Sequence, residues 1–546
     1  MTATASPATE PTEGVVPLPE RPAVTPVEEA LGSTDHKVIG RLYIAAAIGF
    51  GILGMVAGVL SSLERVSLDG YDIVDQAVAT QVFSLHRLSL LYLLVIPITI
   101  GLATVVVPLQ VGARSIVFPR LCATGFWVWL IGGITFVLSY VVDGGPGGAE
   151  PQARELWVAS VGMIVVGLII AVVVLASTVL AARAPGMGLL DTPFFSLSVL
   201  VASVIWIVSL GALLASVVLG FLITTYGPSV LGLSAVGGAE EAWILMSWFA
   251  DQPQVLSLLI VGLGVGTDVV ASVSGAAPRA RGVMFGAIAA FGLLTFGAWS
   301  QTALYPESAD DALAVVGAFA VGIPFLVVVG GWLDTLRRGT PSLGGPVLAV
   351  VVFVVLGLGA LLAGELIVIE TFDLFGSSAV SGLYGSAIAG GLAAAVAGLT
   401  WWAPKIWGRM LNPALANGAA LLVLLGGLLV GVPEIISGFL DQPDPGGLGD
   451  LADTQMLVAS GLDSSVEVLN GVTLAGWALL ALGLLAITVA LAQPSTGRER
   501  EVIDDDPWDN GQTLEWSLGS PPGPDNFDEV PTVASATPLL ATEETS

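Results

Sequence analysis

Few side chains of this chain have the chemistry to hold a metal ion. Its 546 residues include two histidines and one cysteine. His86 lies near the start of the apolar stretch 80–113, and His36 precedes the first apolar stretch. The single cysteine, Cys122, excludes an internal disulfide and a cysteine-based metal cage. His86 is therefore the main candidate ligand for a metal cofactor, because imidazole nitrogen binds copper and haem iron.

A carboxyl group within apolar sequence is the second chemical candidate. Asp251 lies about ten residues into an expected helix, roughly 15 Å deep at 1.5 Å per residue. An ionised carboxylate at that depth is costly, so we expect a protonated or hydrogen-bonded group that faces the bundle interior. Polar side chains also occur within or beside the expected helices, at Gln252, Gln254, Ser300, Gln301 and Thr302. The set is either a proton or cation site, or a closed amide–hydroxyl network that fills space.

The composition indicates which elements must position these residues. The chain is 55% hydrophobic and 11% charged, which excludes a soluble domain of this size and indicates a polytopic membrane protein. Apolar stretches recur at 38–62, 86–108, 118–142, 156–182, 192–222, 241–270, 281–302, 312–334, 345–368, 378–402, 415–439 and 467–492. Each is long enough to cross a hydrocarbon core of about 30 Å. The sequence therefore predicts an all-α fold with twelve transmembrane helices.

The charges of the connecting loops alternate along the chain. One set of loops is basic, with Lys37, Arg41, Arg114, Arg120, Arg183, Arg279, Arg281, Arg337, Arg338, Lys405, Arg409, Arg498 and Arg500. The other set is mainly acidic, apart from Arg65 and Arg154. Basic loops stay cytoplasmic, so we expect both termini on the cytoplasmic side of the cell membrane. The net charge of −27 then reports solvated ends and loops, and the dispersed basic residues give no nucleic-acid surface.

Three domains follow from this pattern. Residues 1–32 are rich in Pro, Thr and Ala and predict a disordered tail without a cleaved signal. Residues 33–495 form the membrane domain, and residues 496–546 a polar, mostly flexible cytoplasmic tail. The apolar side chains that could anchor this tail are Trp508, Leu514, Trp516 and Phe527.

Five stretches resemble one known family in the right order: STDHKVIGRLY, VVPLQVGARSIVFPRL, ARAPGM, PKIWGRMLN and DPWDNGQTLEWSLGSPP. They resemble subunit I of the haem–copper oxidases, which includes the catalytic subunit of aa3-type cytochrome c oxidase. The last stretch looks most like actinobacterial members, and the similarity runs from about 33 to 530. The resemblance implies a twelve-helix protein of the aerobic respiratory chain, with the bilayer and other oxidase or respiratory-chain subunits as partners.

The same resemblance shows where the metal ligands of the family are missing. His86 matches the first ligand of the low-spin haem. The other five histidine positions fall on Gln252, on two residues of the stretch Ser300, Gln301 and Thr302, and on Gly382 and Tyr384. Since Gln, Ser and Thr bind copper poorly, oxygen reduction is the activity that the sequence argues against, and we assign no catalytic residue and no metal site.

The proton-path positions of the family are also changed. The resemblance places Ser115, Cys122 and Gln254 on one path and Val328 on the other. Of the remaining acidic residues in the spans, Asp268, Glu365 and Glu434 lie near span ends, where we expect a wet or interfacial position. The acidic loop 441–453 is expected to be solvated, or to attract a basic partner.

Three functions remain open. The chain is either a degenerate, non-catalytic paralogue that acts in a complex or its assembly, or an electron-transfer subunit with one haem, or a proton or ion conduit that uses Asp251. The haem would be held by His86, with Tyr384 as a candidate opposite ligand, since tyrosine is an accepted axial ligand. Arg87 stands where the family keeps a small residue. We therefore expect no cofactor, with His86 as a neutral, hydrogen-bonded histidine.

Overall fold

The computed structural model describes residues 32–68, 73–227, 239–297, 311–341, 346–444, 461–493 and 505–540. Within these ranges the side chains of residues 224, 239–253 and 311–314 are not described. The chain divides into a short unit, Met1–Ser33, and a main unit, Thr34–Ser546. Residues 32 and 33 are the only described part of the short unit.

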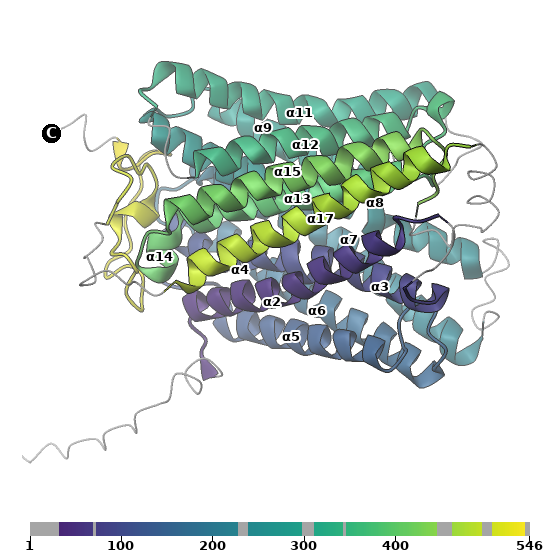
Figure 1. Cartoon of the computed structure of the whole chain (residues 1–546). Coiled ribbons are helices and arrows are strands. Elements are labelled where there is room, and N and C mark those ends of the chain that lie inside the picture. The colour runs from purple at the N-terminus through teal and green to yellow at the C-terminus, as the bar shows by residue number, and fades with distance from the viewer. Residues whose placement is uncertain are drawn as a thin grey trace, which may run out of the picture. The chain divides into compact units, whose positions relative to one another are not determined.

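Helices form the main unit, and their long axes run alongside one another (Figure 1). The helices are α2 (His36–Glu64), α3 (Gln76–Leu88), α4 (Ile96–Gln110), α5 (Pro119–Val141), α6 (Pro151–Ala181), α7 (Phe194–Tyr226), α8 (Ala239–Ser274), α9 (Arg281–Gly297), α11 (Asp311–Arg338), α12 (Val347–Ile367), α13 (Ala379–Trp401), α14 (Ala403–Trp407), α15 (Pro413–Gly438) and α17 (Asp463–Ala492). A π-helical segment, η1 (Ser89–Val95), joins α3 to α4, and short 3-10 turns occur at η2 (Leu189–Asp191), η4 (Glu370–Phe372) and η5 (Leu514–Ser517).

The predicted membrane fold is confirmed. Within the described residues, eleven helices are long and apolar enough to span a membrane. The remaining predicted stretch, 281–302, coincides with the shorter apolar helix α9, and its last residues lie outside the described ranges. Helices that are neighbours in sequence pack together, as in the pairs α5 with α6, α7 with α8 and α15 with α17.

Short polar side chains fix where several helices begin. Asp35 accepts a hydrogen bond from the backbone N–H of Lys37 at 2.9 Å and starts α2. Asp75 caps α3 in the same way, through the backbone N–H of Val78 at 2.9 Å. These caps satisfy backbone donors that have no partner within the helix.

The helix that carries His86 lies at the centre of the bundle. Residues Gln76–Gln110 form one continuous span, and 94% of its most apolar window is buried inside the protein. In a π-helix the carbonyl of Tyr92 would accept from the backbone N–H of the residue five positions later, Pro97. Proline has no backbone N–H, so this bond cannot form. The indole nitrogen of Trp129 on α5 donates to that carbonyl instead, at 3.1 Å. This contact closes the gap and fixes α5 against the central helix.

Glycine lets the backbones of α2 and α4 touch. A Cβ added to Gly40 would lie 2.6 Å from the carbonyl oxygen of Gly101, and one added to Gly101 would lie 2.8 Å from that of Gly40. Small residues at such crossings permit the close packing that holds helices together in lipid.

The described part of the C-terminal segment, residues 505–540, packs on the bundle end where α2 begins and α4 ends (yellow in Figure 1). Trp508 stacks on Trp401 at the end of α13, with ring centroids 4.9 Å apart. Three further predicted anchors are buried, Leu514, Trp516 and Phe527. The contacts extend well beyond these anchors, as far as the bond from the Val533 backbone N–H to the Pro185 carbonyl at 2.9 Å.

We predict that Gly101→Ala lowers the stability of the bundle. The added methyl group forces two backbones apart, and overpacking of this kind costs about 1–3 kcal/mol. The measurement is the thermal unfolding midpoint of the detergent-solubilised protein. Gly418→Ala on α15 is the matched control, because an added Cβ there meets nothing within 4 Å. Equal midpoints for the two variants would contradict the close crossing.

Candidate functional site

His86 lies on α3 and is almost completely buried, with 4% of its surface exposed. Its Nδ1 donates to the carbonyl oxygen of Gly54 on α2 at 2.9 Å, since a carbonyl can only accept. The ring packs at a right angle to that of Trp477 of α17, with ring centroids 4.4 Å apart. The hydrogen on Nδ1 leaves Nε2 as the nitrogen with a lone pair available to an acceptor role or to a ligand.

Tyr384 on α13 lines the same cavity as His86. Its hydroxyl group donates to the backbone carbonyl of Arg87. The guanidinium group of Arg87 lies over the Tyr384 ring, 4.7 Å from the centroid. Tyr384 therefore ties α13 to α3 through the residue that follows His86.

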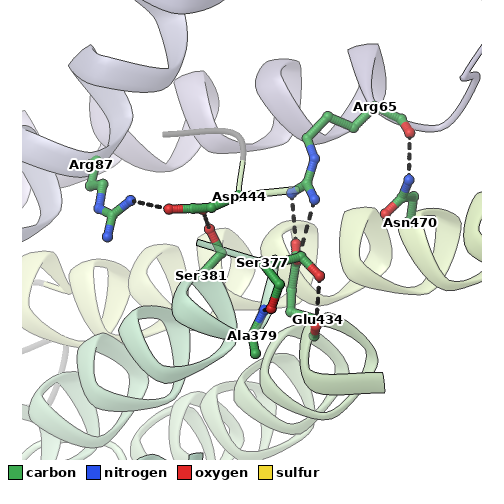
Figure 2. Close-up of polar contacts among 9 residues, drawn as sticks. Arg65, Arg87, Ser377, Ala379, Ser381, Glu434, Asp444 and Asn470 are labelled. Atoms are coloured by element: carbon green, nitrogen blue, oxygen red, sulfur yellow. Dashed lines mark hydrogen bonds and ion pairs between the residues drawn. The ribbon is translucent and has the colours of Figure 1, made fainter. Parts of the chain in front are cut away.

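A buried ion pair lies beside this cavity. Arg65, directly after α2, binds Glu434 of α15 with both ends of its guanidinium group, at 2.7 Å and 3.2 Å (Figure 2). The Glu434 side chain is 2% exposed and that of Arg65 18%. The Arg65 carbonyl accepts a bond from Asn470 of α17 at 2.7 Å. This corrects the expectation of a wet or interfacial Glu434, because a buried carboxylate is tolerated here only through its paired guanidinium group.

A second pair adjoins the first. Arg87 Nη1 lies 3.5 Å from Asp444 Oδ2, and the Ser381 hydroxyl group donates to Asp444 Oδ1 at 2.6 Å (Figure 2). Asp444 belongs to the acidic loop that we expected to be solvated, yet its side chain is 12% exposed. We call the six residues of both pairs and their amide and hydroxyl partners the Arg65–Glu434 cluster: Arg65, Arg87, Ser381, Glu434, Asp444 and Asn470. The cluster joins the ends of α2, α3, α13, α15 and α17.

The space left at this site is small. The cavity has a volume of about 20 Å³ and is lined by Gly58, Ser61, Ser62, Arg65, Phe83, His86, Arg87, Ser381, Tyr384, Val430, Glu434 and Trp477. One water needs about 10–15 Å³ by this measure, whereas small-molecule sites occupy about 300–1,000 Å³. A Cβ added to Gly58 would lie 2.5 Å from the His86 ring. The residues around His86, as packed here, do not fit a haem macrocycle.

The other predicted cavity is described only in part. Asp251 and Gln252 belong to the stretch of α8 whose side chains are not described, and Ser300, Gln301 and Thr302 lie outside the described residues entirely. Gln254 is fully buried, and its Oε1 accepts from the Ser209 hydroxyl group of α7 at 2.5 Å. Its Nε2 has no partner among the described residues. Within those residues no three His, Cys, Asp or Glu side chains come together to hold a metal ion.

The sequence signal for the ion pair was present but incomplete. Arg65 stood out as one of two basic residues in an otherwise acidic set of loops. Its partner lies 369 residues away, so neither spacing nor periodicity could identify Glu434.

The comparisons with known proteins agree with this fold. The model of a family described as "Cytochrome C and Quinol oxidase polypeptide I" matches residues 38–460. Cytochrome c oxidase subunit 1 of Bacillus subtilis is 27% identical, over 93% of this chain and 82% of its own length. Quinol oxidase subunit 1 of the same organism is 25% identical, over 94% and 80%. Cytochrome c oxidase subunit 1 of Corynebacterium glutamicum is 26% identical, over 93% and 87%.

We predict that Glu434→Ala destabilises the protein strongly, because it leaves the Arg65 guanidinium group without its carboxylate. Breaking a fully buried pair costs about 3–5 kcal/mol, and the partial exposure of Arg65 makes this an upper bound. The double variant Arg65→Met/Glu434→Met should recover much of the lost stability, since both charges are then gone. Thermal unfolding of the purified protein measures both effects.

The control is the exposed pair of Arg338 and Asp334 on α11, at 2.9 Å. Asp334→Asn should change the stability by about 0.5 kcal/mol or less. A Glu434→Ala variant as mild as this control would show that the buried pair contributes little.

Proposed function

The chain belongs to the family of cytochrome c and quinol oxidase polypeptide I, and on this premise we propose that it acts as a non-catalytic, subunit I-like membrane protein in a respiratory complex or in its assembly. It is a multi-pass membrane protein of that family. The helical fold is what the chain shares with its relatives, and the redox chemistry that the family's cofactors supply is what we propose it lacks.

The observation that carries the proposal is the packing around His86. In a cofactor-binding member, a macrocycle at this place would fill the space between the helices that surround His86. In this chain Trp477 and the Arg65–Glu434 cluster fill that space, and a cavity of about 20 Å³ remains. Side chains thus supply the contacts between helices that a bound group would otherwise make. The fold is then held together by this chain's own residues.

The changes at the copper positions point the same way. Gln252, Ser300, Gln301 and Thr302 stand at or around the positions where the family resemblance expects copper-binding imidazoles. Amide and hydroxyl groups bind copper poorly, so these residues do not support oxygen chemistry.

Other subunits are the partners that this proposal requires. The relatives are named as subunits of cytochrome c and quinol oxidases. The similarity covers 93% or more of this chain, including the described helices that would present its lateral surfaces. We infer that this chain docks with respiratory-chain or oxidase subunits through those surfaces, in the plasma membrane, with both termini in the cytoplasm.

One observation favours a second candidate, electron transfer through one haem. His86 and Tyr384 line one cavity, and the Nδ1 bond to Gly54 leaves the lone pair on Nε2 available to a ligand. Against it stand the size of the cavity and the engagement of the Tyr384 hydroxyl group with Arg87.

The absorption spectrum of the protein, purified gently from its native membrane, decides between the two. We expect no reduced-minus-oxidised haem band and no copper or iron in stoichiometric amount, because the site as packed has no room for the macrocycle. A haem band close to one per chain that disappears in His86→Ala would overturn the proposal and support electron transfer. A haem band that persists in His86→Ala would show that His86 is a packing residue and does not hold the haem.

Partner capture tests the second half of the proposal. We expect oxidase or other respiratory-chain subunits to be cross-linked to the native protein in intact membranes and identified by mass spectrometry. The control is the same cross-linking after detergent has dispersed the membrane, which removes contacts due to crowding alone. Recovery of the chain without any such subunit would contradict a role in a complex or its assembly.

A further inference from the structure

Two buried carboxyl groups share one amide at the bundle end that the C-terminal segment covers. Gln110, the last residue of α4, donates from Nε2 to Asp268 Oδ2 at 3.0 Å and to Glu515 Oε1 at 2.9 Å. Asp268 belongs to α8 and is 7% exposed, and Glu515 belongs to η5 in the C-terminal segment and is 0% exposed. The site therefore joins two membrane helices to a segment that lies more than 400 residues after α4.

Asp268 has the donors that an ionised carboxylate needs. Its Oδ1 accepts from the backbone N–H of Phe194, and its Oδ2 from that of Phe195, each at 3.1 Å. These N–H groups open the first turn of α7, where the helix dipole also favours negative charge. Gln110 Oε1 is occupied by Ser196, whose hydroxyl group donates to it at 2.7 Å.

Glu515 lacks such a set. Its Oε1 accepts from Gln110 and from the indole nitrogen of Trp402 at 3.1 Å. Its Oε2 is buried and has no hydrogen-bond partner among the described residues. A buried carboxylate with a bare oxygen is costly, whereas the neutral carboxyl group avoids most of that cost.

The cations nearby are engaged elsewhere. The guanidinium group of Arg281 on α9 donates to the carbonyls of Leu190 and Thr192, and lies 4.4 Å from the centroid of the Phe194 ring. Arg281 is on the Asp268 side of the site and forms no ion pair with Glu515 among the described residues.

Lys405 of α14 holds the segment by another route. Its Nζ donates to the Asp505 carbonyl at 2.6 Å, to the Leu518 carbonyl and to the Ser520 hydroxyl group at 3.1 Å. The carboxylates that interact electrostatically with Lys405 are those of Glu515, Asp505 and Asp506. It makes no hydrogen bond to Glu515 within the part of the chain that the structure describes.

We propose that Glu515, together with Asp268 and Gln110, forms a proton-binding site, and that the bound proton fastens residues 505–540 to the bundle. Loss of the proton places two carboxylates on one amide and leaves a charged oxygen without a donor. The segment then binds the bundle more weakly. The ligand is the proton itself, and its binding depends on the pH on the side of the membrane that this bundle end faces.

The direction of the pH effect follows from the burial of Glu515. Burial raises the pKa of this carboxyl group above its ordinary value, against the lowering effect of its hydrogen bonds, including those from Gln110 and Trp402. The docked segment therefore binds the proton more tightly than the free one. The stabilisation of docking by the proton is therefore fully present below the ordinary glutamate pKa of about 4.3. It is lost as the pH rises through the raised pKa of docked Glu515.

Two other titratable groups touch the segment and must be kept apart from Glu515. Burial lowers the pKa of Lys405 to about 8, so its effect has the opposite sign and strengthens docking as the pH rises above that value. His36 bonds to Asn526 of the segment, with Nε2 3.3 Å from Oδ1 and 3.0 Å from Nδ2. The test is therefore run between pH 5 and 7.5, and is repeated in a His36→Gln background.

Hydrogen exchange of the full-length protein in lipid nanodiscs, followed by mass spectrometry, measures docking through peptides that cover residues 505–533. Variants are compared at the same pH, so that the chemical exchange rate cancels. In the wild type we expect protection to fall with rising pH, by up to tenfold per pH unit for one proton. Glu515→Gln should keep the same protection across the range, and exceed the wild type at pH 7.5. Glu529→Gln, an exposed change in the same segment, should behave like the wild type.

The opposite results overturn the proposal. They are a wild-type protection that does not vary with pH, a Glu515→Gln variant that retains the wild-type pH dependence, or one that loses protection at every pH. If Glu515→Gln does not fold, Asp268→Asn supplies the test. Without the neighbouring charge, the protection of the segment should fall less as the pH rises. A pH dependence of protection in Asp268→Asn that equals that of the wild type overturns the shared site.

Discussion

The absence of water within a bilayer constrains this protein more than any other condition. Most buried polar groups find a partner inside the chain, because lipid supplies none. The central helix shows how strictly this applies. His86 bonds to the Gly54 carbonyl, and the carbonyl left open by Pro97 bonds to Trp129. Each of these bonds joins two helices, so the satisfaction of polar groups and the packing of the bundle are one problem.

The Arg65–Glu434 cluster is a second instance of the same constraint. Two arginines enter the region of His86, and two carboxylates meet them from α15 and from the loop after it. Charged pairs of this kind contribute modest net stability, but the loss of one partner is severe. The cluster therefore specifies how five helix ends meet, and it does so without help from a bound group.

The sequence predicted the parts of the structure that follow from periodicity and composition. Apolar length located the spans. Position alone could not predict the burial of Glu434 or Asp268, since both lie near span ends where solvent is the ordinary expectation. Their partners Arg65 and Gln110 are distant in sequence, and such pairs become visible only in three dimensions.

The C-terminal segment has a consequence for the making of the protein. Asn526 bonds to His36, which lies 490 residues earlier, and Glu515 bonds to Gln110, which lies 405 residues earlier. A ribosome synthesises this segment after all of the described helices, so the side chains of His36 and Gln110 are made long before their partners. A truncated chain would insert its helices and still expose unpaired polar groups at one end. The segment thus supplies hydrogen-bond partners to polar side chains of α2 and α4.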